Sequence, residues 1–340
     1  MSEKTNIAWC DSTLNFWEGC TKVSTGCANC YAEARDKRFT GGKLWGKGAP
    51  RRKSKSAVKD ALAFNRKPWI CDECGIATDN ETLGAHVTDG LVCNGKLHHR
   101  RIFSLSLGDW LDDEVPIEWL AEMLDTIRKC PDVDWILCTK RPENFFKRMD
   151  EAQGWDFDFG KRESCGFIRD WRQGTTIPPN IILLASVENQ AMADLRIPQL
   201  LKIPAARRGL SLEPLLGVVN LTIGHDYMKR DTLRGVLKSF NSDGQCKTET
   251  GGEKIDWLII GGESGTSARP CNVEWIRSLV AQGKSAGVPG FVKQFGAVPY
   301  TMDASKLPDG RLVGQWNMRD KKGGDITEWP KDLQVQEFYK

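Results

Sequence analysis

A succession of apolar runs, separated by helical patterns, limits the folds that this chain can adopt. The runs lack apolar–polar alternation, so strands formed by them would be covered on both faces, as in a parallel sheet. We expect strands at 101–107, 133–138, 181–185, 209–212, 256–260 and 290–294. Amphipathic helices are expected at 117–130 and 273–286. The sequence therefore predicts an α/β fold built on a parallel sheet.

Two segments between these elements, and one before them, break this rhythm. We expect one large domain over residues 1–300, with inserts at 41–100, 150–180 and 225–254, and a tail at 301–340 that packs on it. No signal peptide and no apolar run of membrane-spanning length is visible. We therefore expect a cytoplasmic protein without a membrane partner, whose 12 cysteines are thiols or metal ligands rather than disulfides.

Three cysteines lie close together near the start of the chain. Cys20, Cys27 and Cys30 form a C-x6-C-x2-C pattern on a predicted strand-to-helix loop. Three thiolates this close can bind a soft metal centre. A [4Fe–4S] cluster with three cysteine ligands keeps one iron open to a small molecule. The loop would lie at the carboxyl end of a strand, where α/β barrels build active sites.

Polar side chains follow nearly every predicted strand. In a barrel the carboxyl ends of the strands converge on one mouth, so these side chains would surround the cysteine loop. Asp109 and Glu188 could instead cap the helices that follow them. The set is Asp109, Lys140, Arg141, Glu188, Glu213, Glu263, Lys293 and Gln294.

A second cysteine group indicates a zinc site. Cys71 and Cys74 form a C-x2-C knuckle, which Cys93 and then His98 or His99 follow. This order is typical of a Cys3His zinc site that staples a small insert. We favour zinc over free thiols in a loop, with His98 as the fourth ligand and His99 as the alternative.

Between these two cysteine groups the chain is strongly basic. Cations with interleaved aromatic residues suit the phosphates and bases of DNA or RNA. A solvated basic loop is the equally plausible interpretation. The cations are Lys43, Lys47, Arg51, Arg52, Lys53 and Lys55, with Trp45 among them.

Taken together, these motifs resemble one protein family. It is the phage and prophage three-cysteine-motif family, which is itself similar to radical S-adenosylmethionine (SAM) enzymes. The segments that carry the resemblance are the cysteine loop, Asp109, and residues 139–143, 186–189, 213–216 and 261–265. The first cysteine gap here is six residues, whereas radical SAM enzymes usually have three.

The resemblance implies a partial or full TIM-like (β/α) barrel of the radical SAM type. Cys20, Cys27 and Cys30 would then ligate a [4Fe–4S] cluster whose open iron chelates SAM, and SAM cleavage would yield a 5′-deoxyadenosyl radical. An electron donor such as flavodoxin or ferredoxin would reduce the cluster, and a partner protein could present the substrate. The strand-end residues would have two roles. Asp109, Glu188 and Glu213 would bind the cofactor, and Lys140, Arg141, Glu263 and Lys293 would form the catalytic set.

Three functions are compatible with these motifs. The first is a radical SAM enzyme that modifies or repairs a nucleic-acid base, supported by the cysteine loop, the basic run and the zinc insert. The second is an iron–sulfur or zinc protein that binds nucleic acid without catalysis. The third is a radical SAM enzyme that acts on a small molecule or a peptide.

Overall fold

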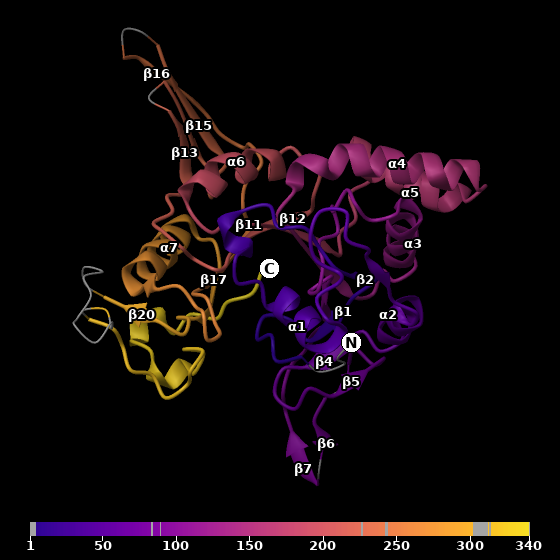
Figure 1. The fold of residues 1–340 in the computed structure, drawn as a ribbon, viewed down its shortest axis with the longest axis horizontal. Helices are drawn as coiled ribbons and strands as arrows, with labels where there is room; N and C mark the ends of the chain where they lie inside the picture. Colours follow the sequence, from indigo (N-terminus) through magenta and orange to yellow (C-terminus); the bar gives the residue numbers. More distant parts are fainter. Residues whose placement is uncertain are drawn as a thin grey trace.

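A seven-stranded parallel sheet forms the centre of the protein. The computed structural model describes residues 5–82, 84–88, 90–225, 227–241, 244–301, 312 and 314–339. The strand order β1-β9-β10-β11-β12-β17-β19 follows the chain, and the sheet curls into an open half-barrel (Figure 1). The predicted α/β fold with a parallel sheet is thus confirmed. The strands are β1 (Ser12–Leu14), β9 (Arg101–Ser104), β10 (Asp134–Thr139), β11 (Ile181–Ser186), β12 (Arg207–Leu212), β17 (Trp257–Gly261) and β19 (Gly290–Gln294).

Helices alternate with the strands and contribute to the larger of two hydrophobic clusters. The helices are α1 (Tyr31–Thr40), α2 (Ala57–Asn65), α3 (Ile117–Arg128), α4 (Phe145–Asp158), α5 (Arg162–Gln173), α6 (Gln190–Leu200) and α7 (Val273–Ala286). Helix α3 buries Leu120, Leu124 and Ile127 along one face, as its periodicity predicts. Helix α7 begins where the Asn272 side chain accepts a hydrogen bond from the Glu274 amide.

Successive side chains of β10, β11, β17 and β19 enter two different hydrophobic clusters. In β10, Trp135 and Leu137 join the large cluster that includes the helices. Ile136 faces the other way, into a smaller cluster with Ile182 of β11. Because strand side chains alternate between faces, this smaller cluster lies on the face of the sheet opposite the large cluster.

The inserts form small sheets of their own. In the first, β3 (Arg52–Lys53) pairs with β2 (Trp17–Glu18), which precedes the insert. The same insert also holds a three-stranded sheet β5-β4-β8 (Ala77–Thr78, Trp69–Cys71, Leu97–His99) and the hairpin β6–β7 (His86–Thr88, Leu91–Cys93). Residues 150–180 hold the end of α4 and all of α5. The third insert is the antiparallel sheet β13–β16 (Thr222–His225, Met228–Asp231, Val236–Phe240, Cys246–Glu249), which projects from the body in Figure 1.

The last residues of the chain run along the outer edge of β19. The Val292 amide donates to the Val335 carbonyl and the Glu337 amide to the Gly290 carbonyl, both at 2.8 Å. Farther along, the Tyr339 hydroxyl donates to Asp134 at 2.8 Å, at the amino end of β10. Nearer the start of the tail, β18 (Cys271–Asn272) pairs with β20 (Pro299–Tyr300), and the short helices η3 (Ile326–Glu328) and η4 (Lys331–Leu333) follow.

Candidate functional site

The loop with the three cysteines lies at the carboxyl edge of the central sheet. Cys20 follows β2, Cys27 ends the short helix η1 (Thr25–Cys27), and Cys30 is the residue that precedes helix α1. Side chains that follow three central strands contact this loop, as the convergence of strand ends predicts. The loop is therefore held from several directions at once.

Arg141, after β10, joins the loop to the residue that follows β9. Its guanidinium donates to the Thr21 carbonyl at 2.7 Å and lies 3.5 Å from Cys20 Sγ. It also pairs with Asp109 at 3.0 Å, and both side chains are nearly fully buried. Asp109 accepts a further hydrogen bond from Thr139 Oγ1 at 2.7 Å. The pair thus fixes the first cysteine against the sheet, and neither residue is left free for a ligand.

Glu188, after β11, holds the middle of the loop. Its carboxylate accepts a hydrogen bond from the Gly26 amide at 3.2 Å and pairs with Arg196 at 2.8 Å. A Cβ atom at residue 26 would lie 2.8 Å from this carboxylate, so the close approach requires glycine. Burial favours the protonated form, but Arg196 and the hydrogen bonds lower the pKa of Glu188 below its usual value. The alternative role considered for Glu188, capping the next helix, is filled by Asn189.

Glu263, after β17, holds the end of the loop. It accepts a hydrogen bond from Asn29 Nδ2 at 3.0 Å and forms an ion pair with Arg269 at 2.6 Å. Arg269 in turn donates to the Thr25 carbonyl at 2.7 Å. Arg269 and Asn29 were absent from the predicted site, because only the folded structure brings residues 240 positions apart together.

The remaining strand-end residues do not bond to the loop. Lys293 of β19 pairs with Glu213, after β12, at 2.5 Å. Lys140 is half-buried and has no carboxylate partner among the described residues. Its positive charge nevertheless acts on Cys30 and Glu188. These three charged groups are the ones that a bound molecule could engage.

Burial favours the protonated form of two thiols of the loop. Burial raises the pKa of Cys20 to about 12, although the Arg141 guanidinium favours the thiolate. Burial also raises the pKa of Cys30, although hydrogen bonds from backbone amides at the start of α1 act in the opposite direction. A metal ion reverses such shifts because it binds the thiolate form. Among the described residues, the three sulfur atoms are not gathered within 4.8 Å of one another, as ligands of a single ion would be.

Much of the basic run is engaged within the protein. Arg51 is buried, with its Nε 2.9 Å from Asp112, which corrects the expectation that it faces a nucleic acid. Arg52 pairs with Glu18, and Lys53 pairs with Glu122. These pairs leave Lys43, Lys47 and Lys55 as the expected cations without an ion pair among the described residues, and all three are exposed or half-exposed.

A second group of cysteines forms a candidate metal centre in the first insert. Ligand atoms of Cys71, Cys74, His86 and Cys93 all lie within 4.8 Å of one another. Cys71 Sγ and Cys93 Sγ are 3.6 Å apart, close to the ~3.8 Å edge of a tetrahedron with zinc–sulfur bonds of about 2.3 Å. Cys74 Sγ and His86 Nε2 are 3.1 Å apart, and this contact lowers the pKa of Cys74 to about 6. The donor set suits a metal such as zinc.

The fourth member of this group is His86, so the prediction of His98 or His99 is wrong. His98 lies on β8 and contacts both carboxylate oxygens of Asp11 at 3.1 Å. His99 packs against the Trp69 ring, with centroids 4.2 Å apart. His86 pairs directly with Cys93 across the hairpin β6–β7, which brings the two ligands together.

Gly95 completes the packing of this metal centre. A Cβ atom at this position would lie 2.5 Å from Cys71 Sγ. The Gly95 amide also donates toward Cys93 Sγ at 3.5 Å, a contact typical of metal-bound thiolates. The turn that follows the last cysteine ligand therefore depends on glycine.

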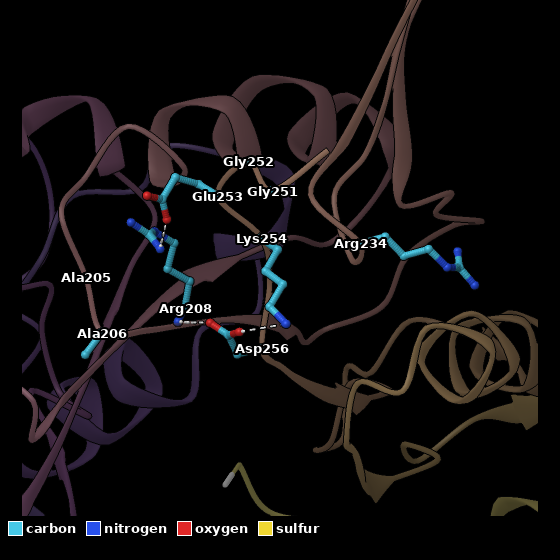
Figure 2. A pocket seen from close by; sticks show the side chains of 9 residues that line it. All are labelled: Ala205, Ala206, Arg208, Arg234, Gly251, Gly252, Glu253, Lys254 and Asp256. Carbon is cyan, nitrogen blue, oxygen red and sulfur yellow. Dashed lines mark hydrogen bonds and ion pairs between the residues drawn. The ribbon is translucent and has the colours of Figure 1, made fainter. Parts of the chain in front are cut away.

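A surface pocket of about 430 Å³ lies at the opposite end of the sheet (Figure 2). Arg208, near the start of β12, and Asp256, just before β17, line it. Arg208 pairs with Glu253 at 2.5 Å, and its amide donates to Asp256 at 3.0 Å. Three cations and two carboxylates line this pocket, which lies far along the strands from the cysteine loop.

Comparison with known proteins places the chain in a family. No curated protein and no solved structure matches it. No helix in the described part of the chain is long and apolar enough to cross a membrane. The family model described as "Protein of unknown function (DUF5131)" matches residues 4–322, which is most of the chain. The protein therefore belongs to the DUF5131 family.

Proposed function

We propose that the protein is a radical SAM enzyme that modifies or repairs a nucleic-acid base. The observation that carries the proposal is the attachment of the three-cysteine loop to the carboxyl edge of a curled parallel sheet. Arg141, Glu188 and Glu263, each from a different strand end, bond to this loop. Loops at this edge are where α/β barrels bind and transform their substrates.

Cys20, Cys27 and Cys30 would hold a [4Fe–4S] cluster. Ligands of different irons stand farther apart than ligands of one ion, so a cluster does not require the three sulfurs to gather as closely as the zinc-type group does. The Arg141 guanidinium beside Cys20 and the start of helix α1 at Cys30 both favour thiolates. When bound, the cluster supplies the electron that cleaves SAM, after reduction by a donor such as flavodoxin or ferredoxin.

The charged strand-end groups that are not bonded to the cysteine loop would bind SAM. Asp109, expected to bind the cofactor, is already paired with Arg141. Lys140 has no carboxylate partner among the described residues and would hold the SAM carboxylate. Glu213, which shares its charge with Lys293, would accept hydrogen bonds from the amino group or the ribose. This assignment replaces the direct contacts expected of Asp109, Arg141 and Glu188.

The basic loop supports a nucleic acid as the substrate. The Gly46 amide donates to the Cys20 carbonyl at 3.0 Å, and Trp45 forms a β-bridge with Cys20. Exposed Lys43 and Lys47 therefore flank the cysteine loop. Phosphates held by these lysines would bring a strand next to the proposed cluster.

Anaerobic reconstitution tests the proposal. Iron and sulfide are counted on the purified protein, which is then reduced with dithionite in the presence of SAM. We expect a four-iron cluster and the formation of 5′-deoxyadenosine. Cys27→Ala should abolish the brown absorbance and leave the zinc content unchanged. A protein that binds zinc but no iron would instead be the non-catalytic nucleic-acid-binding alternative, which the Cys71–Cys93 group favours.

A further inference from the structure

Helix α1 exposes an aromatic ring between cations on its outer face. Phe39 is 66% exposed, and the guanidinium carbons of Arg35 and Arg38 lie 5.6 and 5.1 Å from its ring centroid. Ala32 and Asp36 are buried and turn the opposite side of the helix toward the protein. The exposed ring, flanked by two guanidinium groups, offers an aromatic face of the kind on which a base can stack.

The charges around this ring are largely uncompensated. Arg38, Lys43 and Lys47 have no ion pair among the described residues. Arg35 shares the single carboxylate of Glu18 with Arg52. Binding of an anionic partner would therefore not require Arg38, Lys43 or Lys47 to break an ion pair within the protein.

This surface continues into the cysteine loop. The amides of Gly42 and Leu44 donate to Asp36, which folds the chain after α1 back onto the helix. The next residues reach the cysteine loop, where the Gly46 amide donates to the Cys20 carbonyl at 3.0 Å. At its other end, α1 begins directly after Cys30. Phe39 and the three cysteines thus belong to one connected segment of structure.

We propose that the α1 surface binds an unpaired nucleic-acid strand, with one base stacked on Phe39 and phosphates on Arg38, Lys43 and Lys47. A base inside a duplex is covered on both faces and has no free face for the ring, whereas an unpaired base has one. Arginine beside the ring adds cation–π attraction for the stacked base. The inference rests on the proposed function for the identity of the substrate, and it names the form in which that substrate is bound.

Fluorescence anisotropy tests this surface on the full-length, zinc-loaded protein. The probe is a labelled single-stranded oligonucleotide of about 12 nucleotides, within the usual range of strand-binding sites. Phe39→Ala should weaken binding about tenfold, the loss of one base–aromatic stack. Arg38→Gln should reduce the slope of log affinity against log salt by about 0.7. A blunt duplex of the same sequence should bind more weakly than the single strand.

Matched variants control for nonspecific effects. Phe157→Ala removes another exposed ring, 75% exposed on α4, and should bind like the wild type. Lys37→Gln removes one charge from the same helix, but Lys37 is already paired with Glu33 at 2.9 Å, so the salt slope should stay. Circular dichroism verifies that each variant is folded. The side chains changed in all four variants are exposed.

Three outcomes would overturn the inference. These are equal binding by Phe39→Ala and wild type, equal affinity for duplex and single strand, or equal competition by polyglutamate and by an unlabelled single strand. The proposed function fails separately. Binding through α1 without 5′-deoxyadenosine in the reconstituted assay would refute the enzyme and keep the surface. Formation of 5′-deoxyadenosine without strand binding through α1 would refute the α1 surface and keep the proposed enzyme.

Discussion

The assignment of His86 to the metal centre leads to a sharp test. We expect His86→Ala to weaken zinc binding strongly, whereas His98→Ala should leave it intact. His86 Nε2 lies 3.1 Å from Cys74 Sγ, while His98 is bonded to Asp11 outside the centre. The two variants remove the same side chain from residues only 12 positions apart.

The size of the effect follows from the ligand count. Structural zinc sites bind with about 10–16 kcal/mol, shared here by four ligands. Loss of one ligand should therefore remove about 3–4 kcal/mol, which corresponds to a zinc affinity about 100- to 1000-fold weaker. For His98→Ala we expect only a loss of stability of about 1–2 kcal/mol, from the broken contact with Asp11.

Competition with a colorimetric zinc chelator measures the affinities. The purified proteins are titrated with the chelator, and the released zinc is read from the absorbance of its complex. Gly95→Ala provides an intermediate case, because its Cβ atom would press on Cys71 Sγ without removing a ligand. Zinc release from His98→Ala at chelator concentrations that leave His86→Ala loaded would refute the assignment.

Three further predictions concern the sheet and the cysteine loop. Arg141→Leu should lower the free energy of unfolding by about 3–5 kcal/mol, because Asp109 remains buried without its partner. In urea titrations, adding Asp109→Leu should restore most of this loss. Additive losses from the two substitutions would contradict the pairing. Burial opposes ionisation of Asp11, but hydrogen bonds from its histidine and arginine partners lower its pKa. The contribution of Asp11 to stability should therefore be present above about pH 4 and be lost as the pH falls further. Asp11→Asn should remove this part of the acid dependence of the denaturation midpoint. Gly26→Ala should displace Glu188 and reduce the iron bound on reconstitution, whereas an unchanged iron count would show that the loop tolerates the displacement.

The central sheet was predictable because its strands are continuous apolar runs. The bounds of β19 and α7 match the expected ranges, and the other central strands deviate by a few residues at their ends. Local patterns are enough here, since each strand is buried on both faces and each helix on one. The helix α5 lies within a segment for which we expected only an insert, although Ile168 and Trp171 are buried at helical spacing there.

Long-range contacts were the part that the sequence did not reveal. The convergence of strand ends on the cysteine loop was expected, but not that Arg141 and Glu188 would bond to the loop itself. His86 was missed because it lies between the two arms of the zinc motif rather than after them, and only the hairpin pairing with Cys93 brings it to the metal centre. Arg51 resembled its basic neighbours in sequence, and its burial depends on Asp112, 61 residues away.

The path of the C-terminal residues covers part of the amino end of the central sheet. After following β19, the chain places Phe338 under Arg101 and Tyr339 beside Asp134, at the amino ends of β9 and β10. Both aromatic side chains pack against the smaller hydrophobic cluster of the sheet. Under the proposed function, substrate and product would therefore approach from the carboxyl edge of the sheet, where the cysteines lie.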